Sequence, residues 1–358
     1  MQQTENVPVE AATQALNDWF SKHRRELPWR AAPTPYGTWL CEVIMQQTRI
    51  DQGTAYWHRF MEAFPTVEAL ARAEEGEVLK LWQGLGYYSR ARNLHRAARW
   101  VVEELDGVFP ETAAGWRELP GVGPYTAAAV ASICFGEAVA AVDGNVNRVV
   151  ARFVGLDEPV DRPAGRRAVE AAAEGLLDRR APGRHNESMM ELGALVCTPR
   201  APKCGECPLA GGCASAGEAE AAARRPVKAG KAKVVEVTAV GHVLTDGERV
   251  AVRVRPEAGI WGGLWEFPGV WTEGQSSGGD WRAPVAGATW RGEVVPGRAH
   301  VLSHRRVWGR FGVWEVEGPG ADWGADWAWL TWEEAQAKPW PKMTERIWDE
   351  LRATAGLD

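Results

Sequence analysis

The segment from Leu119 to Val149, LPGVGPYTAAAVASICFGEAVAAVDGNVNRV, constrains the fold more than any other part of the chain. Gly121 and Gly123 flank Val122, so the backbone can approach a ligand closely there without a Cβ in the way. Pro124 suits the first turn of a helix that continues through the alanines that follow. The free N–H groups at the start of such a helix bind anions, and phosphate is the natural guest.

Asp143 lies one short helix further along the chain, directly before Gly144 and Asn145. An aspartate in that position is usually the N-cap of the next helix, where its side chain accepts backbone N–H groups. It is also a candidate for a functional carboxylate, and the segment alone leaves both interpretations open. The role of Asp143 therefore depends on what the rest of the chain indicates.

The bulk composition is that of an ordinary globular protein with room for two domains. The chain has 358 residues, of which 45% are apolar and 25% charged, and this length is ample for buried cores. The net charge of -6 gives no argument for nucleic-acid binding, which would need local basic clusters. The longest apolar stretch, residues 126–142, is interrupted and too short to span a bilayer. No signal peptide is recognisable, so we expect a cytoplasmic protein.

Several segments have the apolar periodicity of amphipathic helices. Glu42 lies off the apolar stripe of a helix expected from Trp39 to about Asp51, with Thr38 as its cap. On its own, Glu42 would be interpreted as a solvated helix residue. Further helices are expected at residues 11–25, 67–81, 162–178 and 186–196.

Six cysteines in a cytoplasmic protein favour metal binding or free thiols over disulfides. The spacing C-x6-C-x2-C-x5-C joins Cys197, Cys204, Cys207 and Cys213. Thiolates so close together suit either a structural zinc ion or a [4Fe–4S] cluster, and ligand chemistry alone does not decide between them. Cys41 and Cys134 lie in apolar segments, and we expect both to be buried free thiols.

Residues 84–100 combine a glycine turn, two tyrosines and a run of basic side chains, with no acidic residue. Arginines in such a segment can bind phosphates, and an aromatic side chain beside a turn can insert between bases. A solvated basic face of a helix gives the same pattern. The segment is therefore a candidate nucleic-acid contact, and composition alone does not establish it.

The composition changes after residue 216. Residues 217–233 are rich in alanine and carry a net positive charge, which predicts a tether. Alternating patterns at residues 234–244, 249–255 and 306–317 then predict strands. The second part of the chain is therefore expected to be a mixed α/β domain.

Four of these features together resemble the endonuclease III superfamily of helix-hairpin-helix DNA glycosylases. They are LPGVGPYTA with VDGNVNRV, WLCEVIMQQT, GLGYYSRARNL and the cysteine spacing. The likeness is greatest to the adenine-removing branch, the MutY family. It implies an all-α helix-hairpin-helix glycosylase domain over residues 1–216, a basic linker over 217–233, and a smaller α/β Nudix-like domain over 234–358. It also implies that the four spaced cysteines bind a [4Fe–4S] cluster rather than zinc.

The resemblance assigns roles to the carboxylates. In the matching family the glutamate at the place of Glu42 is the general acid, and Asp143 would stabilise the positively charged sugar. Tyr125 and Asn145 would position water and polar groups around that centre. Endonuclease III has a lysine at the place of Tyr125 that attacks the sugar, and a phenol cannot form that Schiff base. We therefore expect a monofunctional glycosylase that leaves an abasic site.

The resemblance also marks residues for contact with DNA, including an adenine extruded from the stack. The residues expected around the extruded adenine are Trp29, Arg30 and Glu187. Those expected at the opposite base and its neighbours in the stack are Gln47, Thr48, Leu85 and Tyr87. A phosphate is expected at the backbone amides of Gly121, Val122 and Gly123.

Residues 259–269 resemble the opening of a Nudix fold, but the chain continues WTEGQSSGGDW, without the glutamates that hold magnesium. Hydrolysis of a nucleoside diphosphate derivative is therefore not expected. A MutY carboxy-terminal domain has this fold without that activity, and an apolar-Ser-His motif in it recognises 8-oxoguanine. The matching residues here are Leu302, Ser303 and His304, with leucine in the place of the usual phenylalanine.

These expectations support the hypothesis of a monomeric adenine DNA glycosylase that acts on double-stranded DNA with adenine opposite 8-oxoguanine or guanine. An endonuclease III-like enzyme for oxidised pyrimidines is one alternative, and Tyr125 and the second domain argue against it. A Nudix hydrolase with an added DNA-binding domain lacks the metal glutamates. A non-catalytic DNA-binding protein with a structural cluster predicts that Glu42→Gln and Asp143→Asn change nothing, whereas the glycosylase hypothesis predicts loss of base release.

Overall fold

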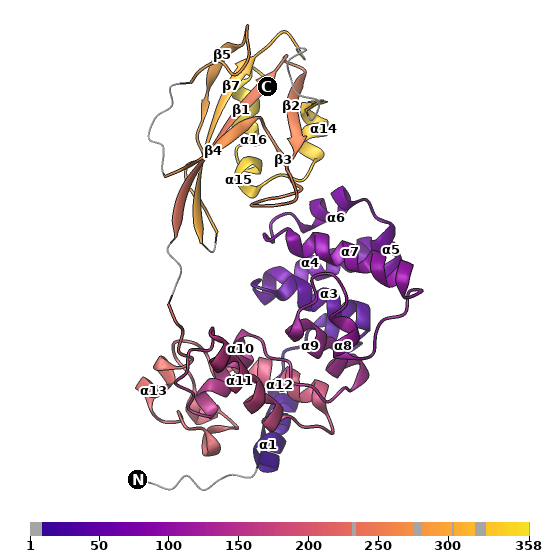
Figure 1. Ribbon diagram of the computed structural model, residues 1–358, viewed down its shortest axis with the longest axis vertical. Helices are drawn as coiled ribbons and strands as arrows, with labels where there is room; N and C mark the ends of the chain where they lie inside the picture. Colours follow the sequence, from indigo (N-terminus) through magenta and orange to yellow (C-terminus); the bar gives the residue numbers. More distant parts are fainter. Residues whose placement is uncertain (1–8, 231–233, 275–280, 303, 319–326, 358) are drawn as a thin grey trace. The chain divides into compact units, whose positions relative to one another are not determined.

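The computed structural model describes residues 9–230, 234–274, 281–302, 304–318 and 327–357. The chain divides into two compact units, one formed by residues 1–72 with 93–230 and the other by residues 73–92 with 231–358 (Figure 1). The first unit is helical, and the second contains a mixed β-sheet with short helices. In the described part of the chain, no helix is long and apolar enough to cross a membrane.

The helices predicted at residues 11–25, 162–178 and 186–196 are present with ends that differ by a few residues, whereas those predicted at 39–51 and 67–81 differ from the structure. The helices of the first part of the chain are α1 (Val9–His23), α2 (Pro28–Ala31), α3 (Pro35–Met45), α4 (Ile50–Ala63), α5 (Val67–Arg72), α6 (Glu75–Trp82), α7 (Ser89–Glu104), α8 (Ala113–Trp116), α9 (Pro124–Phe135), α10 (Gly144–Phe153), α11 (Pro163–Leu176), α12 (Pro182–Leu195) and α13 (Ala219–Arg224). Short 3-10 turns at Cys204–Glu206 and Ala210–Gly212 lie between α12 and α13.

The helix that carries Glu42 starts and ends earlier than the sequence indicated. The cap of α3 is Thr34, whose Oγ1 accepts the Gly37 N–H at 3.1 Å, so the assignment of this cap to Thr38 is wrong. Pro35 takes the first helical position, where its missing N–H costs nothing. The helix ends at Met45 because the backbone turns away at the next two residues, and Gln47 has a φ of +58°.

The single helix predicted for residues 67–81 is divided into α5 and α6. Glu74 begins α6 with a capping box, in which its side chain and that of Glu77 each accept the other's backbone N–H. The capping box thus starts a new helix, although the apolar periodicity runs through both α5 and α6.

The glycine turn lies between α8 and α9, as predicted. Gly121 has a φ of +76°, and a Cβ added there would lie 2.4 Å from the Asn93 side chain, so both backbone and space require glycine. Gly123 is the N-cap of α9 and Pro124 occupies its first position. The predicted turn and helix are therefore both present.

A second glycine brings α12 against the start of α10. A Cβ on Gly193 would lie 2.6 Å from the Cβ of Asn145. Around this contact, buried apolar side chains of α1, α10, α11 and α12 form one core, which includes Leu16, Val150 and Leu192. The close approach holds the Asp143 loop beside α12, which carries Glu187.

Most of the predicted linker packs on the helical unit. The Ala222 carbonyl accepts a hydrogen bond from the Arg152 Nε at 2.9 Å, and the Val227 carbonyl accepts the Val160 N–H at 3.0 Å. The Asp161 side chain accepts the Ala229 N–H at 2.9 Å. Residues 231–233 lie outside the described residues.

The second unit is built on a mixed sheet whose strand order is β3-β2-β1-β7-β5, with β4 paired to β1, β6 to β7 and β8 to β2. Its strands are β1 (Val235–Thr245), β2 (Arg249–Val254), β3 (Trp265–Glu266), β4 (Gly269–Glu273), β5 (Thr289–Val294), β6 (His300–Val301), β7 (Arg305–Glu315) and β8 (Ala328–Thr331). The strands β1 and β7 are parallel, with Val237 opposite Val307, and the other pairs are antiparallel.

Short helices complete the core of this unit. They are α14 (Trp332–Ala337), α15 (Lys342–Glu345) and α16 (Trp348–Thr354). The side chains of Trp340, Trp348 and Leu351 are buried with Val243 and Val313 of the sheet. The predicted strands correspond to β1, β2 and β7, and their alternation is explained by one face that packs on these helices.

Candidate active site

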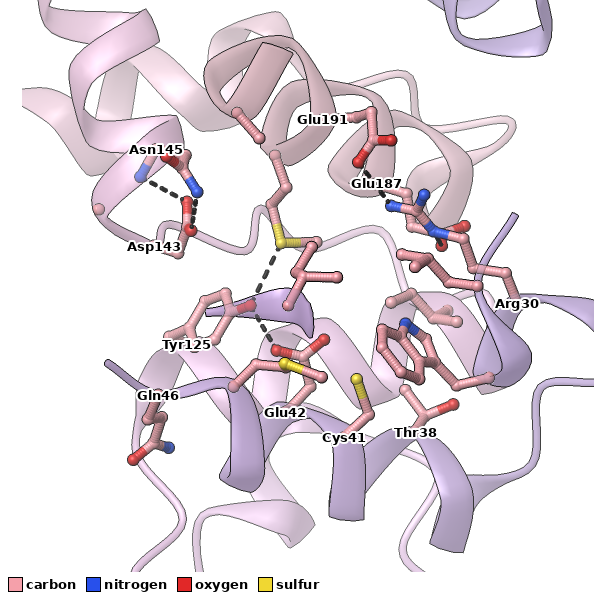
Figure 2. Close-up of a pocket in the computed structure, with 18 of the residues that line it drawn as sticks. Arg30, Thr38, Cys41, Glu42, Gln46, Tyr125, Asp143, Asn145, Glu187 and Glu191 are labelled. Atoms are coloured by element: carbon pink, nitrogen blue, oxygen red, sulfur yellow. Dashed lines mark hydrogen bonds and ion pairs between the residues drawn. The ribbon is translucent and has the colours of Figure 1, made fainter. Parts of the chain in front are cut away.

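A cavity of about 600 Å³ opens in the helical unit. It is lined from α2 and α3, from the starts of α9 and α10, and from α12 (Figure 2). The residues of the sequence prediction that line it are Trp29, Arg30, Glu42, Gln47, Thr48, Tyr125, Asp143, Asn145 and Glu187. The fold therefore brings together side chains from segments that are far apart in the chain.

Glu42 of α3 lies between the two sides of the cavity and contacts Tyr125 (Figure 2). The Tyr125 phenol donates a hydrogen bond to Glu42 Oε2. Burial raises the pKa of Glu42 to about 7, although this hydrogen bond lowers it. The negative charges of Asp143 and Glu187 raise it further. A carboxyl group with such a pKa can release a proton near neutral pH, which is the property of a general acid.

Asp143 is the N-cap of α10, as its sequence context indicated. Its Oδ1 accepts the N–H groups of Asn145 at 2.9 Å and Val146 at 2.7 Å, and its Oδ2 accepts Asn145 Nδ2 at 3.0 Å. Burial raises the pKa of Asp143 above its ordinary value, and these hydrogen bonds only partly offset the rise, because N–H donors favour the charged carboxylate. A capping role and a functional role are therefore compatible, since the cap fixes the carboxylate beside the cavity.

Tyr125, in the first turn of α9, is close to two other side chains of the cavity. Its phenol oxygen contacts Glu42 and lies 3.2 Å from Met190 Sδ. Burial raises the pKa of Tyr125 well above its ordinary value, and the charges of Glu42 and Asp143 add to this effect. The phenol therefore keeps its proton and acts as a hydrogen-bond donor.

The opposite side of the cavity contains an ion-pair network. Arg30 Nε donates to Glu187 Oε1 at 2.9 Å, and Arg30 NH2 donates to Glu191 Oε2 at 3.2 Å. Arg25 NH2 also donates to Glu191 Oε2, at 2.7 Å. Burial raises the pKa of Glu187, and the charge of Arg30 lowers it. Figure 2 shows this network on the side of the cavity away from Asp143 and Asn145.

Arg25, Met190 and Glu191 also line the cavity and contact its predicted residues or one another, although sequence analysis assigned them no role. For Glu191 a signal was available, because residues four apart lie on one helix face and Glu187 was already a candidate. Met190 and Arg25 carry no such signal. Their positions depend on how α1 and α12 approach one another.

The remaining predicted DNA contacts that the structure describes do not line this cavity. Leu85 is buried, whereas Tyr87 is 46% exposed and has a φ of +48°. The Val122 N–H donates to the Leu119 carbonyl at 3.1 Å, so the expected phosphate contact falls mainly to the amides on either side of it. His304 is exposed, and Ser303 lies outside the described residues.

The four spaced cysteines line one small cavity after α12. Among the described residues, no group of three or more His, Cys, Asp or Glu side chains is placed to hold a single metal ion. A cubane cluster binds each thiolate at a different iron, so four thiols around one cavity suit a cluster. Burial raises the pKa of Cys207 to about 11 in the free thiol form, and bound iron would reverse this effect by its positive charge.

Arg152 of α10 holds the cysteine loop. Its NH1 lies 3.4 Å from Cys197 Sγ and donates to the Thr198 carbonyl at 2.7 Å, and its NH2 donates to the Pro199 carbonyl at 3.0 Å. These bonds join the loop to α10 through its backbone carbonyls. Outside this loop, Cys41 is buried as expected, but Cys134 is only partly buried, so the prediction that it is buried is wrong.

These features define a class of protein, the base-excision DNA glycosylases with an iron–sulfur cluster. The features are a helix-hairpin-helix, a carboxylate that caps the following helix, and a four-cysteine loop. Residues 40–175 match the family model of the HhH-GPD superfamily base excision DNA repair protein. Residues 197–213 match the iron-sulfur binding domain of endonuclease III, and residues 239–350 match the NUDIX domain.

Relatives and solved structures agree with this class. The chain is 34% identical to the adenine DNA glycosylase of Rattus norvegicus, over 96% of this chain and 79% of the relative. It is 33% identical to the adenine DNA glycosylase of Homo sapiens, over 84% of this chain and 67% of the relative. A thermostable thymine-DNA glycosylase is similar in structure, with a TM-score of 0.53 and 28% identity over 57% of this chain and 95% of that chain. Endonuclease III in a non-covalent DNA complex has the same fold, with a TM-score of 0.50 and 22% identity over 60% of this chain and 97% of that chain.

The chain belongs to the MutY family of adenine DNA glycosylases. It is a DNA-binding enzyme of base excision repair with a [4Fe–4S] cluster. The predicted fold class, a helix-hairpin-helix domain with an iron–sulfur loop followed by a Nudix-like domain, is confirmed.

Proposed function

We propose that this enzyme hydrolyses the N-glycosidic bond of adenine mispaired with 8-oxoguanine or guanine, with Glu42 as general acid and Asp143 as the group that stabilises the sugar cation. The observation that supports this most strongly is that both carboxylates line one cavity, where Glu42 accepts one hydrogen bond from a phenol and Asp143 accepts three from N–H donors. We also propose that it acts as a cytoplasmic monomer, with domains at residues 1–216 and 234–358 joined by the linker 217–233.

The proposed reaction has two requirements. Adenine becomes a better leaving group when a ring nitrogen is protonated, and the sugar then carries positive charge. Glu42 supplies the proton, because its pKa of about 7 leaves a large protonated fraction at neutral pH. Asp143 supplies a fixed negative charge to the sugar, and water then completes the hydrolysis. Asn145, which donates to Asp143 at 3.0 Å, keeps that carboxylate in place.

The different surroundings of the two carboxyl groups support this division of roles. Glu42 accepts its hydrogen bond from one phenol and is otherwise held in the cavity by burial, which favours the neutral acid. Asp143 accepts bonds from three N–H donors, which favour the anion. Environments that separate the pKa values of two carboxyl groups are the usual basis for acid and anion roles in sugar chemistry.

The adenine must leave the base stack before it can enter the cavity, at a cost of about a few kcal/mol. Gln47 and Tyr87 are the proposed occupants of the gap. Both have positive φ values, +58° and +48°, which are uncommon for side chains of this size and are typical of functional loops. Inside the cavity, the guanidinium of Arg30 and the carboxylate of Glu187 would bind the polar edge of the base.

The preference for the opposite base is assigned to the Nudix-like domain. His304 is exposed and directly precedes β7. In the sequence it follows Leu302 and Ser303, the other two residues of the proposed recognition motif. We propose that this motif contacts 8-oxoguanine. Leucine lacks the ring of the usual phenylalanine, so stacking on the opposite base is expected to be weaker than in other members of the family.

Base release from three duplexes tests the proposal. The duplexes carry adenine opposite 8-oxoguanine, guanine or thymine, and strand breaks are scored with and without alkali. We expect breaks for the two mispairs and only after alkali, because Tyr125 cannot form a Schiff base. Breaks without alkali, with a covalent complex trapped by borohydride, would assign the enzyme to the lyase branch. No release from any duplex by cluster-loaded protein would support a DNA-binding protein without catalysis.

The pH dependence tests the role of Glu42. Under single-turnover conditions the rate constant should be level below about pH 7 and fall about tenfold per unit above it, as Glu42 loses its proton. Glu42→Gln should lower the rate constant by about 10²- to 10⁴-fold and remove this limb. DNA affinity, measured in parallel by titration of the same duplex, should be retained. An unchanged pH profile in the variant would remove Glu42 from the mechanism.

A further inference from the structure

Glu191 is a buried carboxylate that contacts two arginines at the edge of the cavity. Its side chain is 1% exposed. Its Oε1 accepts the Arg25 backbone N–H at 2.8 Å and Arg25 Nε at 2.9 Å, and its Oε2 accepts Arg25 NH2 at 2.7 Å and Arg30 NH2 at 3.2 Å. A bidentate pair of this kind has a well-defined geometry. Glu191 therefore has an almost complete set of hydrogen bonds, and none of them involves a group expected to touch the substrate other than Arg30.

Arg30 is held by several contacts. Its Nε donates to Glu187, its NH2 to Glu191, and its NH1 to the Arg25 carbonyl at 3.2 Å. Its guanidinium also lies over the Phe20 ring, 5.3 Å from the ring centre. With only 11% of its side chain exposed, Arg30 has little freedom to move. The contact with Glu191 determines which nitrogen of Arg30 is left to face Glu187.

The charges on this side of the cavity balance. Arg25 and Arg30 carry two positive charges, and Glu187 and Glu191 carry two negative charges when ionised. Although burial opposes its charge, hydrogen bonds from Arg25 and Arg30 lower the pKa of Glu191 to about 2, so it stays ionised. Without Glu191, the buried guanidinium of Arg30 and the partly exposed guanidinium of Arg25 would leave Glu187 as the one carboxylate of the network. Buried charges are poorly screened, so the excess would act on the rest of the cavity.

Glu42 is one of the groups that this excess would reach. The charge of Arg30 already lowers the pKa of Glu42, against the raising effects of burial and of Asp143 and Glu187. The other titratable or charged groups that act on this network are Arg24, Asp51, Cys41 and Tyr125. An uncompensated Arg30 would therefore favour ionised Glu42, which cannot donate a proton.

We infer that Glu191 is a positioning residue for base release: it fixes Arg30 against Glu187 and supplies the negative charge that prevents Arg30 from ionising the general acid. The inference rests on the proposed role of Glu42. According to this inference, Glu191 affects the protonation of Glu42 without contacting it. A purely structural Glu191, which only joins the end of α1 to α12, would lower the amount of folded enzyme without changing its response to pH.

The test is the single-turnover rate constant for adenine release from the adenine–8-oxoguanine duplex, with cluster-loaded enzyme, between about pH 5 and about pH 9. Glu191→Gln removes the charge with little change of shape, and Glu191→Asp keeps the charge on a shorter side chain. The matched control is Asp157→Asn, because Asp157 also pairs with two arginines, Arg224 and Arg225, and does not line the cavity. The single-turnover rate constant does not depend on the fraction of enzyme that is active. The burst amplitude reports that fraction separately.

We expect Glu191→Gln to move the midpoint of the profile to lower pH. Its rate constant should fall about tenfold at the alkaline end and stay within about twofold of the parent at the acid end. Glu191→Asp should keep the parent midpoint, and Asp157→Asn should leave the whole profile unchanged. A uniform loss at every pH, a lower amplitude alone, or an equal shift in Glu191→Asp would overturn the inference.

Arg25→Met gives a second test that does not require Glu191→Gln to fold, since Arg25 is 34% exposed and its removal leaves Glu191 paired with Arg30. The network then has an excess negative charge, which favours the protonated form of Glu42. The midpoint of the pH profile should therefore move to higher pH. A shift to lower pH, or none, would contradict the inference. Glu42→Gln separates the two proposals: if it does not abolish the midpoint of the parent enzyme, the role of Glu42 fails, and otherwise only the role of Glu191 is at stake.

Discussion

The two sides of the cavity hold their carboxylates in different ways. On the α10 side, Asp143 accepts hydrogen bonds from Asn145 and Val146, two and three residues away in the chain. On the α12 side, Glu187 and Glu191 are held by the guanidinium groups of Arg25 and Arg30, which lie between 157 and 166 residues away. One carboxylate is fixed by local backbone, and the others by tertiary ion pairs.

This difference separates two electrostatic tasks. Among the described residues, Asp143 has no ion-pair partner within 4 Å, as its proposed role at a sugar cation requires. Glu187 and Glu191 are paired with arginines, so under the proposed function their side of the cavity would bind the base through directed hydrogen bonds rather than net charge. Glu42 lies between the two sides, and its protonation depends on both.

Replacement of Asp143 should have the largest effect and should separate the proposed catalytic role of its charge from its capping role. Asparagine is as good an N-cap as aspartate, so Asp143→Asn should keep the stability within about 0.5 kcal/mol. The same change removes the negative charge, and we expect the single-turnover rate constant to fall by about 10³-fold. Asp157→Asn makes the same chemical change outside the cavity and should leave the rate unchanged. A rate loss of Asp143→Asn that is matched by lost stability would assign the effect to the cap instead.

The same contrast explains how much of this site could be predicted from the sequence. Asp143 was recognisable because both its cap and its neighbours are local, and Gly121 and Pro124 mark the turn and helix beside it in the same way. Resemblance to a family then selected Glu42 from many helix carboxylates. Glu191 was missed although it lies one helical turn from Glu187, because its ion pairs with Arg25 and Arg30 depend on tertiary packing, which no local pattern encodes.

Two errors in the predicted helix boundaries have local causes. Thr34 and Thr38 are both plausible caps before an apolar helix, and the signal that favours Thr34 is Pro35, which suits the first helical position. In α5 and α6, one continuous apolar pattern covered two helices, and the capping box at Glu74 was the sign of a break. In both cases residues that end or start a helix were more informative than its hydrophobic stripe.

Replacement of Glu187 tests the α12 side and should have a smaller effect than that of Asp143. In Glu187→Gln the amide oxygen can still accept from Arg30, so the side chain should stay in place while its charge is lost. We expect the single-turnover rate constant to fall about tenfold, as for loss of one charge-assisted hydrogen bond. The control is Glu174→Gln, where Glu174 accepts the Ala140 N–H at 2.7 Å and does not line the cavity. An effect as large as that of Asp143→Asn would mean that net charge matters equally on both sides.

The smallest effect is expected from the cap of α3, which positions Glu42 by local backbone as Asp143 is positioned at α10. Thr34→Ala removes the acceptor of the Gly37 N–H, and the loss should be about 1 kcal/mol of unfolding free energy. The side chain of Glu42 is two turns further along a buried helix, so the rate constant should stay within about twofold. Denaturant unfolding and single-turnover release, measured on the same preparation, check both quantities. A large rate loss in Thr34→Ala would contradict this expectation. It would show that the cap of α3 positions Glu42, the proposed general acid, and does not only stabilise the helix.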